Sequence, residues 1–279
     1  GGILHSRPLA LNYGATRGYS QSNPNIRILF GSGDGIFHIV ENTDTLGRES
    51  GRELFGFFPR EMLSTLAAQR EAGPGGRLYG VDGSPVLLKH DRNRDGTLDH
   101  ADGDTAWVYF GLRRGGSAYY ALDVSDPDAL PRLMWTIRPT QGGEFDALGM
   151  TFSTPVVARV NYSGAPEDVL IFSGGYHGGW TQENTARIGK DLGADDDNFG
   201  NAIYIVNART GELVWKAEAG ATGASSNVHF EHAGLVDSIP SDVTVLVSPD
   251  GVVHRLYVGD TGGAVWRVDL PPNRGDDDN

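Results

Sequence analysis

The sequence predicts an all-β fold made of one strand-rich unit repeated along the chain. Three observations predict this: apolar runs separated by glycine-rich turns recur four times, Gly and Pro number 40 and 14 in 279 residues, and 39% of residues are hydrophobic. Glycine and proline at this frequency, without a strict three-residue period, indicate many tight turns between short strands. A chain of this length can bury a sizeable core, so we expect a globular protein with little helix.

The repeated pattern is an apolar run, a glycine-rich turn and a second apolar run. Phe30, Phe110, Phe172 and Val258 are the equivalent positions when the copies are aligned. The copies are RILFGSGDGIFHIV (27–40), WVYFGLRRGGSAYYALDV (107–124), VLIFSGGYHGG (169–179) continued by NAIYIVNARTGELVW (201–215), and RLYVGDTGGAVWRVDL (255–270). Internal repeats of this kind decide the fold of the whole chain.

Each copy is preceded by another short strand signal, mostly introduced by Ser-x-Pro or Ser-Pro, and usually followed by a fourth strand. The preceding signals are HSRPLALNY (5–13), DGSPVLLKH (82–90), FSTPVVARV (152–160) and SDVTVLVS (241–248), and examples of the fourth strand are LMWTI (133–137) and LVWKAE (213–218). Repeated antiparallel four-stranded units are the signature of a β-propeller. We therefore expect four to five recognisable blades, which can be incomplete or irregular, in a single domain over residues 1–279. The spacing between copies exceeds the length of a minimal blade, about 40–50 residues, so the loops must contain insertions. A β-sandwich is the alternative fold.

Two local features refine this picture. NARTGELVW (207–215) resembles the tail of the tryptophan-docking motif of quinoprotein-type propellers, so we expect Trp215 to pack between blades of a quinoprotein-like propeller. One short helix is predicted near residues 58–70, where Pro59 suits a first helical position and Met62, Leu63 and two later residues, Leu66 and Ala67, form an apolar stripe. We interpret this helix as a cover on the rim of the propeller.

Charge and composition exclude several classes of function. The net charge of −13 argues against binding to nucleic acid or to an anionic membrane surface and favours cations as inorganic partners. The absence of cysteine excludes disulfides, thiolate metal sites and cysteine nucleophiles, and it leaves the redox compartment open. The sequence contains no run of about 18 apolar residues, so it does not predict a membrane-spanning helix.

Residues 91–99, DRNRDGTLD, match the template of a calcium-binding loop. Asp91, Asn93 and Asp95 occupy positions 1, 3 and 5, Gly96 occupies position 6, and Thr97 and Asp99 follow at positions 7 and 9. Calcium takes six to eight oxygen ligands, and a tight loop turns alternate side chains inward, with Thr97 offering its backbone carbonyl. The predicted metal ligands are Asp91, Asn93, Asp95, Thr97 and Asp99.

The flanks of this loop distinguish it from an EF-hand. Position 12 is Asp102 rather than Glu, and the flanking segments read as strands, so we expect an EF-hand-like loop within a β-hairpin. Asp102 or Asp104 could complete the ligand set directly or through water. Magnesium fits a flexible protein cage less well than calcium. A solvated acidic turn is the alternative interpretation.

Three other segments are weaker candidates. LVSPDGVVH (246–254) occupies the equivalent loop of the fourth copy but has Leu246 and His254 in place of the first and last aspartates, so we expect no calcium there. GADDDNFGN (193–201) has adjacent rather than alternating carboxylates and is interpreted as a solvated loop. Arg274-Gly275-Asp276 is an integrin-type tripeptide that we attribute to chance.

Taken together, the motifs resemble the C-terminal propeller of type IV pilus biogenesis and tip-adhesin proteins of the PilC/PilY type. The resemblance spans nearly the whole chain in the family's order and is carried by FGFFPREMLSTL, RLYGVDGSPV, VYFGLRRGGSAYYALDVSDP, LGMTFSTPVVARV, NAIYIVNARTGELVW and DVTVLVSPDGVVHRLYVGDTGGAVWRVDL. It implies that the chain is the C-terminal portion of a longer, exported, pilus-associated protein at the cell surface. It also implies Ca²⁺ held by the aspartate-rich loop, and pilus subunits, minor pilins or a host or abiotic surface as partners.

The leading hypothesis is a non-enzymatic, calcium-binding pilus adhesin or biogenesis factor. Such a protein would support pilus extension against retraction, twitching motility and surface attachment. The alternative is a quinoprotein-like dehydrogenase propeller, which the Thr-Gly-x-x-x-Trp tail suggests. It is disfavoured because such enzymes use about eight regular blades and often vicinal cysteines, whereas this chain has fewer recognisable blades and no cysteine. A hydrolase is a weaker alternative, because the eight histidines show no metalloprotease spacing.

Overall fold

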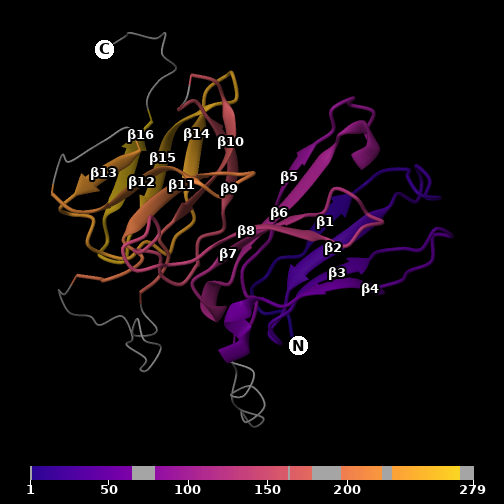
Figure 1. Cartoon of the computed structure of the whole chain (residues 1–279), viewed down its shortest axis with the longest axis horizontal. Coiled ribbons are helices and arrows are strands. Elements are labelled where there is room, and N and C mark those ends of the chain that lie inside the picture. The colour runs from indigo at the N-terminus through magenta and orange to yellow at the C-terminus, as the bar shows by residue number, and fades with distance from the viewer. Residues whose placement is uncertain (1, 65–78, 163, 178–195, 222–227, 271–279) are drawn as a thin grey trace. The chain divides into compact units, whose positions relative to one another are not determined.

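The computed structural model describes residues 2–64, 79–162, 164–177, 196–221 and 228–270 (Figure 1). Within these residues, sixteen strands form four sheets, and the helical elements include three single 3₁₀ turns. The all-β class is therefore confirmed. By its contacts the chain separates into two compact units, Gly1–Thr136 and Ile137–Asn279, each holding two sheets. The expectation of a single domain over 1–279 stays a prediction.

The first unit contains sheet 1 and sheet 2, both antiparallel where their register is defined. Each sheet follows the predicted order of strands, in which neighbours along the chain are neighbours in the sheet. Sheet 1 comprises β1 (Leu9–Asn12), β2 (Ile26–Gly31), β3 (Phe37–Glu41) and β4 (Glu53–Phe57); sheet 2 comprises β5 (Val86–His90), β6 (Thr105–Gly111), β7 (Tyr119–Asp123) and β8 (Arg132–Ile137).

The second unit contains sheet 3 and sheet 4. Sheet 3 has the order β13-β12-β11-β10-β9, and sheet 4 has the order β14-β15-β16. The bounds are β9 (Val156–Val160), β10 (Glu167–Ser173), β11 (Ala202–Asn207), β12 (Leu213–Ala219), β13 (His229–His232), β14 (Thr244–Val247), β15 (Val253–Gly259) and β16 (Val265–Asp269). The added strand β13 runs parallel to β12 and was not predicted.

The four predicted repeats correspond to the four sheets. Phe30, Phe110, Phe172 and Val258 each occupy the last position but one of the second strand. Their partners are the second residue of the third strand in sheets 1, 2 and 4, and the third residue, Tyr204, in sheet 3. This register confirms the equivalence proposed from sequence. The first strands and the fourth strands β8 and β12 also fall where the sequence places them.

The Ser-x-Pro signal has a structural cause in sheets 1 and 3, and Ser241, which has no proline two positions later, makes the same contact in sheet 4. The Oγ atoms of Ser6, Ser153 and Ser241 accept from the backbone N–H of the last residue of the second strand, at 2.9, 3.3 and 3.1 Å. In sheet 2 this position is Gly83, where a Cβ atom would lie 2.2 Å from the Gly111 carbonyl oxygen. A side chain is therefore excluded there.

Each unit has one apolar core between its two sheets. In the first unit Phe37 of sheet 1 stacks on Phe110 of sheet 2 with ring centroids 4.1 Å apart, and Phe57 contacts Tyr120 edge to face. In the second unit Trp215 is 7% exposed and lies in a cluster with apolar residues of both sheets, such as Ile205 and Leu256. The prediction that Trp215 packs between repeated units is consistent with this burial.

The predicted helix near residues 58–70 is described only at its start. A 3₁₀ turn, η1 (Arg60–Met62), follows Pro59, and residues 63 and 64 are helical. Met62 is fully buried, whereas Leu63 is 59% exposed, so this part of the expected stripe is divided between core and solvent. The remainder, including Leu66 and Ala67, lies outside the described residues. No helix in the described part of the chain is long and apolar enough to cross a membrane.

Candidate metal centre

The predicted ligand loop lies in a β-hairpin, as the sequence indicated. It connects β5 to β6, and His90 pairs with Thr105 where the two antiparallel strands meet the loop. Asp99 begins a second 3₁₀ turn, η2 (His100–Asp102), and Gly103 ends it in the left-handed region with φ 83°. The flanks are therefore strands rather than the helices of an EF-hand.

Packing against the two residues that follow β1 anchors the centre of the loop. Leu98 is 1% exposed, and its N–H donates to the Tyr13 carbonyl at 3.0 Å. Gly14, with φ +80°, lets the loop approach closely, because a Cβ atom there would lie 3.0 Å from the Gly96 carbonyl oxygen. Sheet 1 and the hairpin of sheet 2 are thus joined at this point.

Asp104 holds the two ends of the loop together. Its side chain is 1% exposed, and it accepts from the backbone N–H groups of Arg92 at 2.9 Å and Asp99 at 3.0 Å, one on each oxygen. A buried carboxylate with both oxygens engaged stabilises the loop backbone. Its role in this arrangement is structural, so Asp102 is the stronger of the two additional ligand candidates.

Asp91 has one oxygen engaged and one oxygen without a partner. Its Oδ2 accepts from the Gly96 N–H at 2.9 Å, across the sharp turn that Arg94 (φ 59°) and Gly96 (φ 85°) form. Its Oδ1 is buried without a hydrogen-bond partner. A buried carboxylate oxygen without a donor is costly, and a bound cation would remove that cost.

Asp95, Asn93 and Thr97 form a connected group beside Asp91. The Thr97 hydroxyl and N–H donate to Asp95 Oδ1 at 2.6 and 2.8 Å, and these bonds, the hydroxyl first, hold the pKa of Asp95 below its usual value. Asn93 Nδ2 lies 3.1 Å from Asp95 Oδ2 and 3.2 Å from Asp102 Oδ2. The partly positive Asn93 NH₂ group therefore lies between the carboxylates of Asp95 and Asp102. A position between two carboxylates is also one that favours a cation.

Asp99 has partners different from those of the other four predicted ligands. Its Oδ1 accepts from the Ala101 N–H at 3.0 Å and lies 3.9 Å from the Arg17 guanidinium. Across the described residues, no three His, Cys, Asp or Glu side chains are gathered closely enough to hold a metal. The loop nevertheless fits a hard cation, because oxygen-bearing residues occupy alternate positions at Asp91, Asn93, Asp95 and Thr97. In addition, Asp91 Oδ1 lacks a hydrogen-bond partner.

The weaker candidate segments have other local structures. The connection from β14 to β15 is a tight turn in which the Val252 N–H donates to Asp250 Oδ1 at 3.1 Å. In the 193–201 cluster, Asp197 is buried and pairs with His177 Nδ1 at 3.0 Å and the Ser238 N–H at 2.7 Å, so it is a structural carboxylate. Residues 193–195 and the Arg274-Gly275-Asp276 tripeptide lie outside the described residues.

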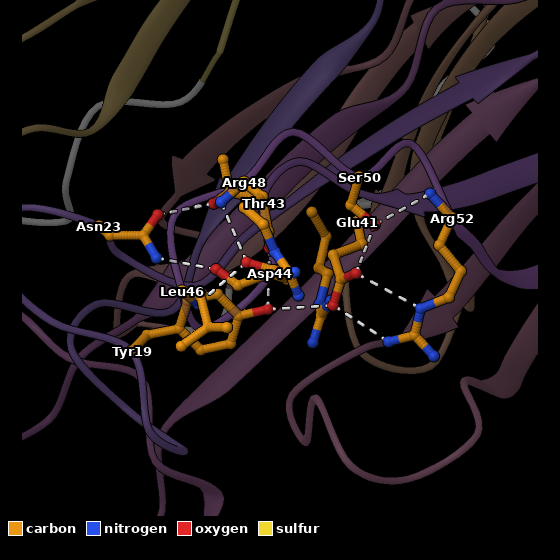
Figure 2. Close-up of polar contacts among 10 residues, drawn as sticks. Tyr19, Asn23, Glu41, Thr43, Asp44, Leu46, Arg48, Ser50 and Arg52 are labelled. Atoms are coloured by element: carbon orange, nitrogen blue, oxygen red, sulfur yellow. Dashed lines mark hydrogen bonds and ion pairs between the residues drawn. The ribbon is translucent and has the colours of Figure 1, made fainter.

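A polar cluster around Glu41 in sheet 1 was not predicted from sequence (Figure 2). The Glu41 carboxylate, 6% exposed, accepts from Tyr19, Ser50, Arg52 and, at 3.4 Å, Arg27. Hydrogen bonds from Arg52, Ser50 and Tyr19, with Arg52 contributing most, lower the pKa of Glu41 to about 2. The only sequence signal is a charged residue at an inward position of an alternating strand.

Comparison with known proteins decides the family. Residues 8–279 match the family model described as the PilY1 β-propeller domain. The chain belongs to the PilY1 β-propeller family. A β-propeller rather than a β-sandwich is thereby the fold, and the predicted kinship with pilus biogenesis proteins is confirmed; the quinoprotein-like type stays a prediction.

Relatives of the PilY1 domain come from two organisms. The chain is 29% identical over 258 residues to the type IV pilus biogenesis factor PilY1 of Pseudomonas aeruginosa strain UCBPP-PA14, covering 90% of this chain and 18% of that protein. It is 25% identical over 249 residues to a PilY1 homolog of Xylella fastidiosa strain Temecula1, covering 88% of this chain and 16% of the homolog. The chain therefore spans less than a fifth of the length of these relatives.

A solved PilY1 structure has the same fold. The crystal structure of the Pseudomonas aeruginosa PilY1 C-terminal domain matches with a TM-score of 0.55 and 26% sequence identity, over 88% of this chain and 38% of that one. The resemblance of the sequence to a C-terminal propeller agrees with this match.

Proposed function

We propose that this propeller serves a type IV pilus biogenesis factor and that its 91–104 hairpin binds calcium. The relatives described above are named as pilus biogenesis factors and none as a dehydrogenase, which favours the pilus role over the quinoprotein alternative. The observation that carries the calcium proposal is the Oδ1 atom of Asp91, which is buried without a hydrogen-bond partner in a loop whose predicted ligand atoms are all oxygens.

Asp91, Asn93, Asp95 and the Thr97 carbonyl would hold the ion, with Asp102 as the additional ligand. Calcium supplies positive charge that carboxylates of the loop would otherwise have to balance with donors such as the Asn93 amide. Asp99 would join the set by leaving its contact with Arg17. Because Leu98 and Gly14 join the loop to the residues that follow β1, its rigidity bears directly on the core between sheets 1 and 2.

The proposed biological role is non-enzymatic and extracellular. We infer that the calcium-loaded hairpin presents a fixed surface to pilus subunits, minor pilins or an attachment surface, and so supports pilus extension, twitching motility and adhesion. Support comes from the family, whose members are named pilus biogenesis factors. No part of this role requires a membrane span in this chain.

Two measurements test the proposal. The melting temperature of the purified chain should be higher in calcium than in chelator, and calcium should raise it more than magnesium does. Asp95→Asn should abolish this rise in melting temperature, whereas Asp250→Asn should leave it unchanged. In a full-length protein, Asp95→Ala should reduce surface pili and twitching relative to Asp250→Ala. A calcium shift that Asp95→Asn leaves intact would disprove the site, and normal piliation with a lost shift would disprove its role.

A further inference from the structure

A second polar site lies at the other end of β6 from the calcium-loop candidate. The hairpin 91–104 precedes β6, whereas the β6–β7 connection follows it and contains η3 (Arg113–Gly115). The seven residues of β6 separate the two connections by about 20 Å. The second site is formed by Arg113 and Arg114 together with residues of two other segments, His5 and 79–82.

Glycines fix the turn that carries the two arginines. A Cβ atom at Gly115 would lie 1.8 Å from the Gly80 carbonyl oxygen, so only glycine allows the turn to pack on the segment containing Tyr79 and Asp82. Arg113 adopts the left-handed region with φ 51°. Backbone strain of this kind in a non-glycine residue is concentrated at functional sites, where the surrounding structure imposes it.

A buried carboxylate beneath the turn orients the cationic groups. Asp82 has a side chain only 3% exposed and lies 2.8 Å from His5 Nδ1 and 3.4 Å from Arg113 Nη1. Because Asp82 is so strongly buried, its partners are held in one geometry rather than being mobile surface side chains.

Tyr79 orients the second arginine. The Arg114 guanidinium carbon lies 5.0 Å from the Tyr79 ring centroid, and Nη1 donates to the Tyr79 hydroxyl at 3.1 Å. The His5 ring stacks on Tyr79 with centroids 6.3 Å apart. Arg114 and His5 are exposed, and the side chains of Ile3 and Leu4, which precede His5, are 45% and 41% exposed. Planar cationic groups and apolar surface are therefore presented together.

The chemistry of this arrangement favours a carboxylate. An arginine presents parallel N–H donors that match a carboxylate in a two-pronged geometry, and stacking on tyrosine fixes the plane. Extended polyanions such as nucleic acid or anionic membranes are disfavoured by the net charge of −13. We propose that Arg113 and Arg114, with Tyr79 and His5, bind the carboxylate of an acidic residue in a peptide segment of a partner protein, whose apolar neighbours contact Ile3 and Leu4.

The test uses a blocked tripeptide, acetyl-Gly-Glu-Leu-amide, titrated into the ¹⁵N-labelled chain with NMR detection at Gly115 and Gly116. The expected result is a saturable shift at these amides that acetyl-Gly-Gln-Leu-amide does not produce. Arg114→Lys keeps the charge but loses the planar fork, so affinity should fall about fivefold or more. Arg132→Lys, at an arginine of β8 paired with Asp123 and 76% exposed, should bind like the unmodified chain.

Each other outcome overturns the proposal. Equal shifts with the glutamine peptide, absence of a saturable shift, or equal affinity of Arg114→Lys would show that the arginines do not bind a carboxylate. Inorganic phosphate that displaces the peptide at lower concentration than acetate would assign the site to phosphate instead.

Discussion

Replacing Glu41 by glutamine removes the charge at the centre of the sheet 1 polar cluster. The carboxylate receives donors from Arg52 at 3.0 Å and Arg27 at 3.4 Å, and the side chains of Glu41 and Arg27 are 7% and 10% exposed. A buried arginine that loses its anionic partner, together with weakened bonds from Tyr19 and Ser50, should cost about 2–3 kcal/mol in the free energy of unfolding. Urea unfolding with amide exchange in β2 and β3 measures this loss.

The pH dependence of this effect has a definite sign. The pKa of Glu41 is lowered from 4.5 to about 2 in the folded chain, so the folded state favours the charged form. Its contribution is complete above about pH 4.5 and is lost as pH falls toward 2. The stability difference between the unmodified chain and Glu41→Gln should therefore shrink over that interval. The control Glu53→Gln, at a carboxylate 54% exposed, should change stability by less than about 0.5 kcal/mol. A pH-independent difference, or a loss no larger than that of the control, would refute the reasoning.

Three further substitutions test the repeat. Gly83→Ser should destabilise the chain by about 2 kcal/mol or more, because its Cβ would lie 2.2 Å from a backbone carbonyl oxygen. The control is Gly2→Ser, whose Cβ would meet no atom within 4 Å. Thermal unfolding compares the two variants, and equal stability would contradict the close packing at Gly83. Ser6→Ala should cost about 1 kcal/mol in urea unfolding, since the last N–H of β2 loses its acceptor. Trp215→Ala should cost about 3–5 kcal/mol in the same assay, and a loss below about 1 kcal/mol would remove it from the core.

Much of the fold could be predicted because the repeat is written in local patterns. Apolar runs around glycine turns located the second and third strands, and the register of Phe30, Phe110, Phe172 and Val258 follows from that alternation. Strand β13 was missed because HFEH (229–232) is not an apolar run and its parallel pairing depends on β12. Long-range pairing of this kind leaves no local signal.

The candidate metal centre shows where sequence reasoning ends. The alternation of oxygen-bearing residues and the sharp turn at Gly96 could be predicted from the template. That Asp104 is buried and fully engaged with loop N–H groups could not, because sequence spacing does not distinguish a ligand carboxylate from one that supports the backbone. The contact of Asp99 with Arg17 likewise depends on a residue 82 positions away, in the connection between β1 and β2.

Calorimetric titration of calcium into the chain, alongside Asp91→Asn and Asp250→Asn, tests the central claim most directly. One calcium ion should bind per chain, with affinity about tenfold or more lower in Asp91→Asn and unchanged in Asp250→Asn, because Asp91 carries the buried unpartnered oxygen. Absence of binding, or binding that Asp91→Asn leaves unaltered, would contradict the assignment of the 91–104 hairpin as a calcium site.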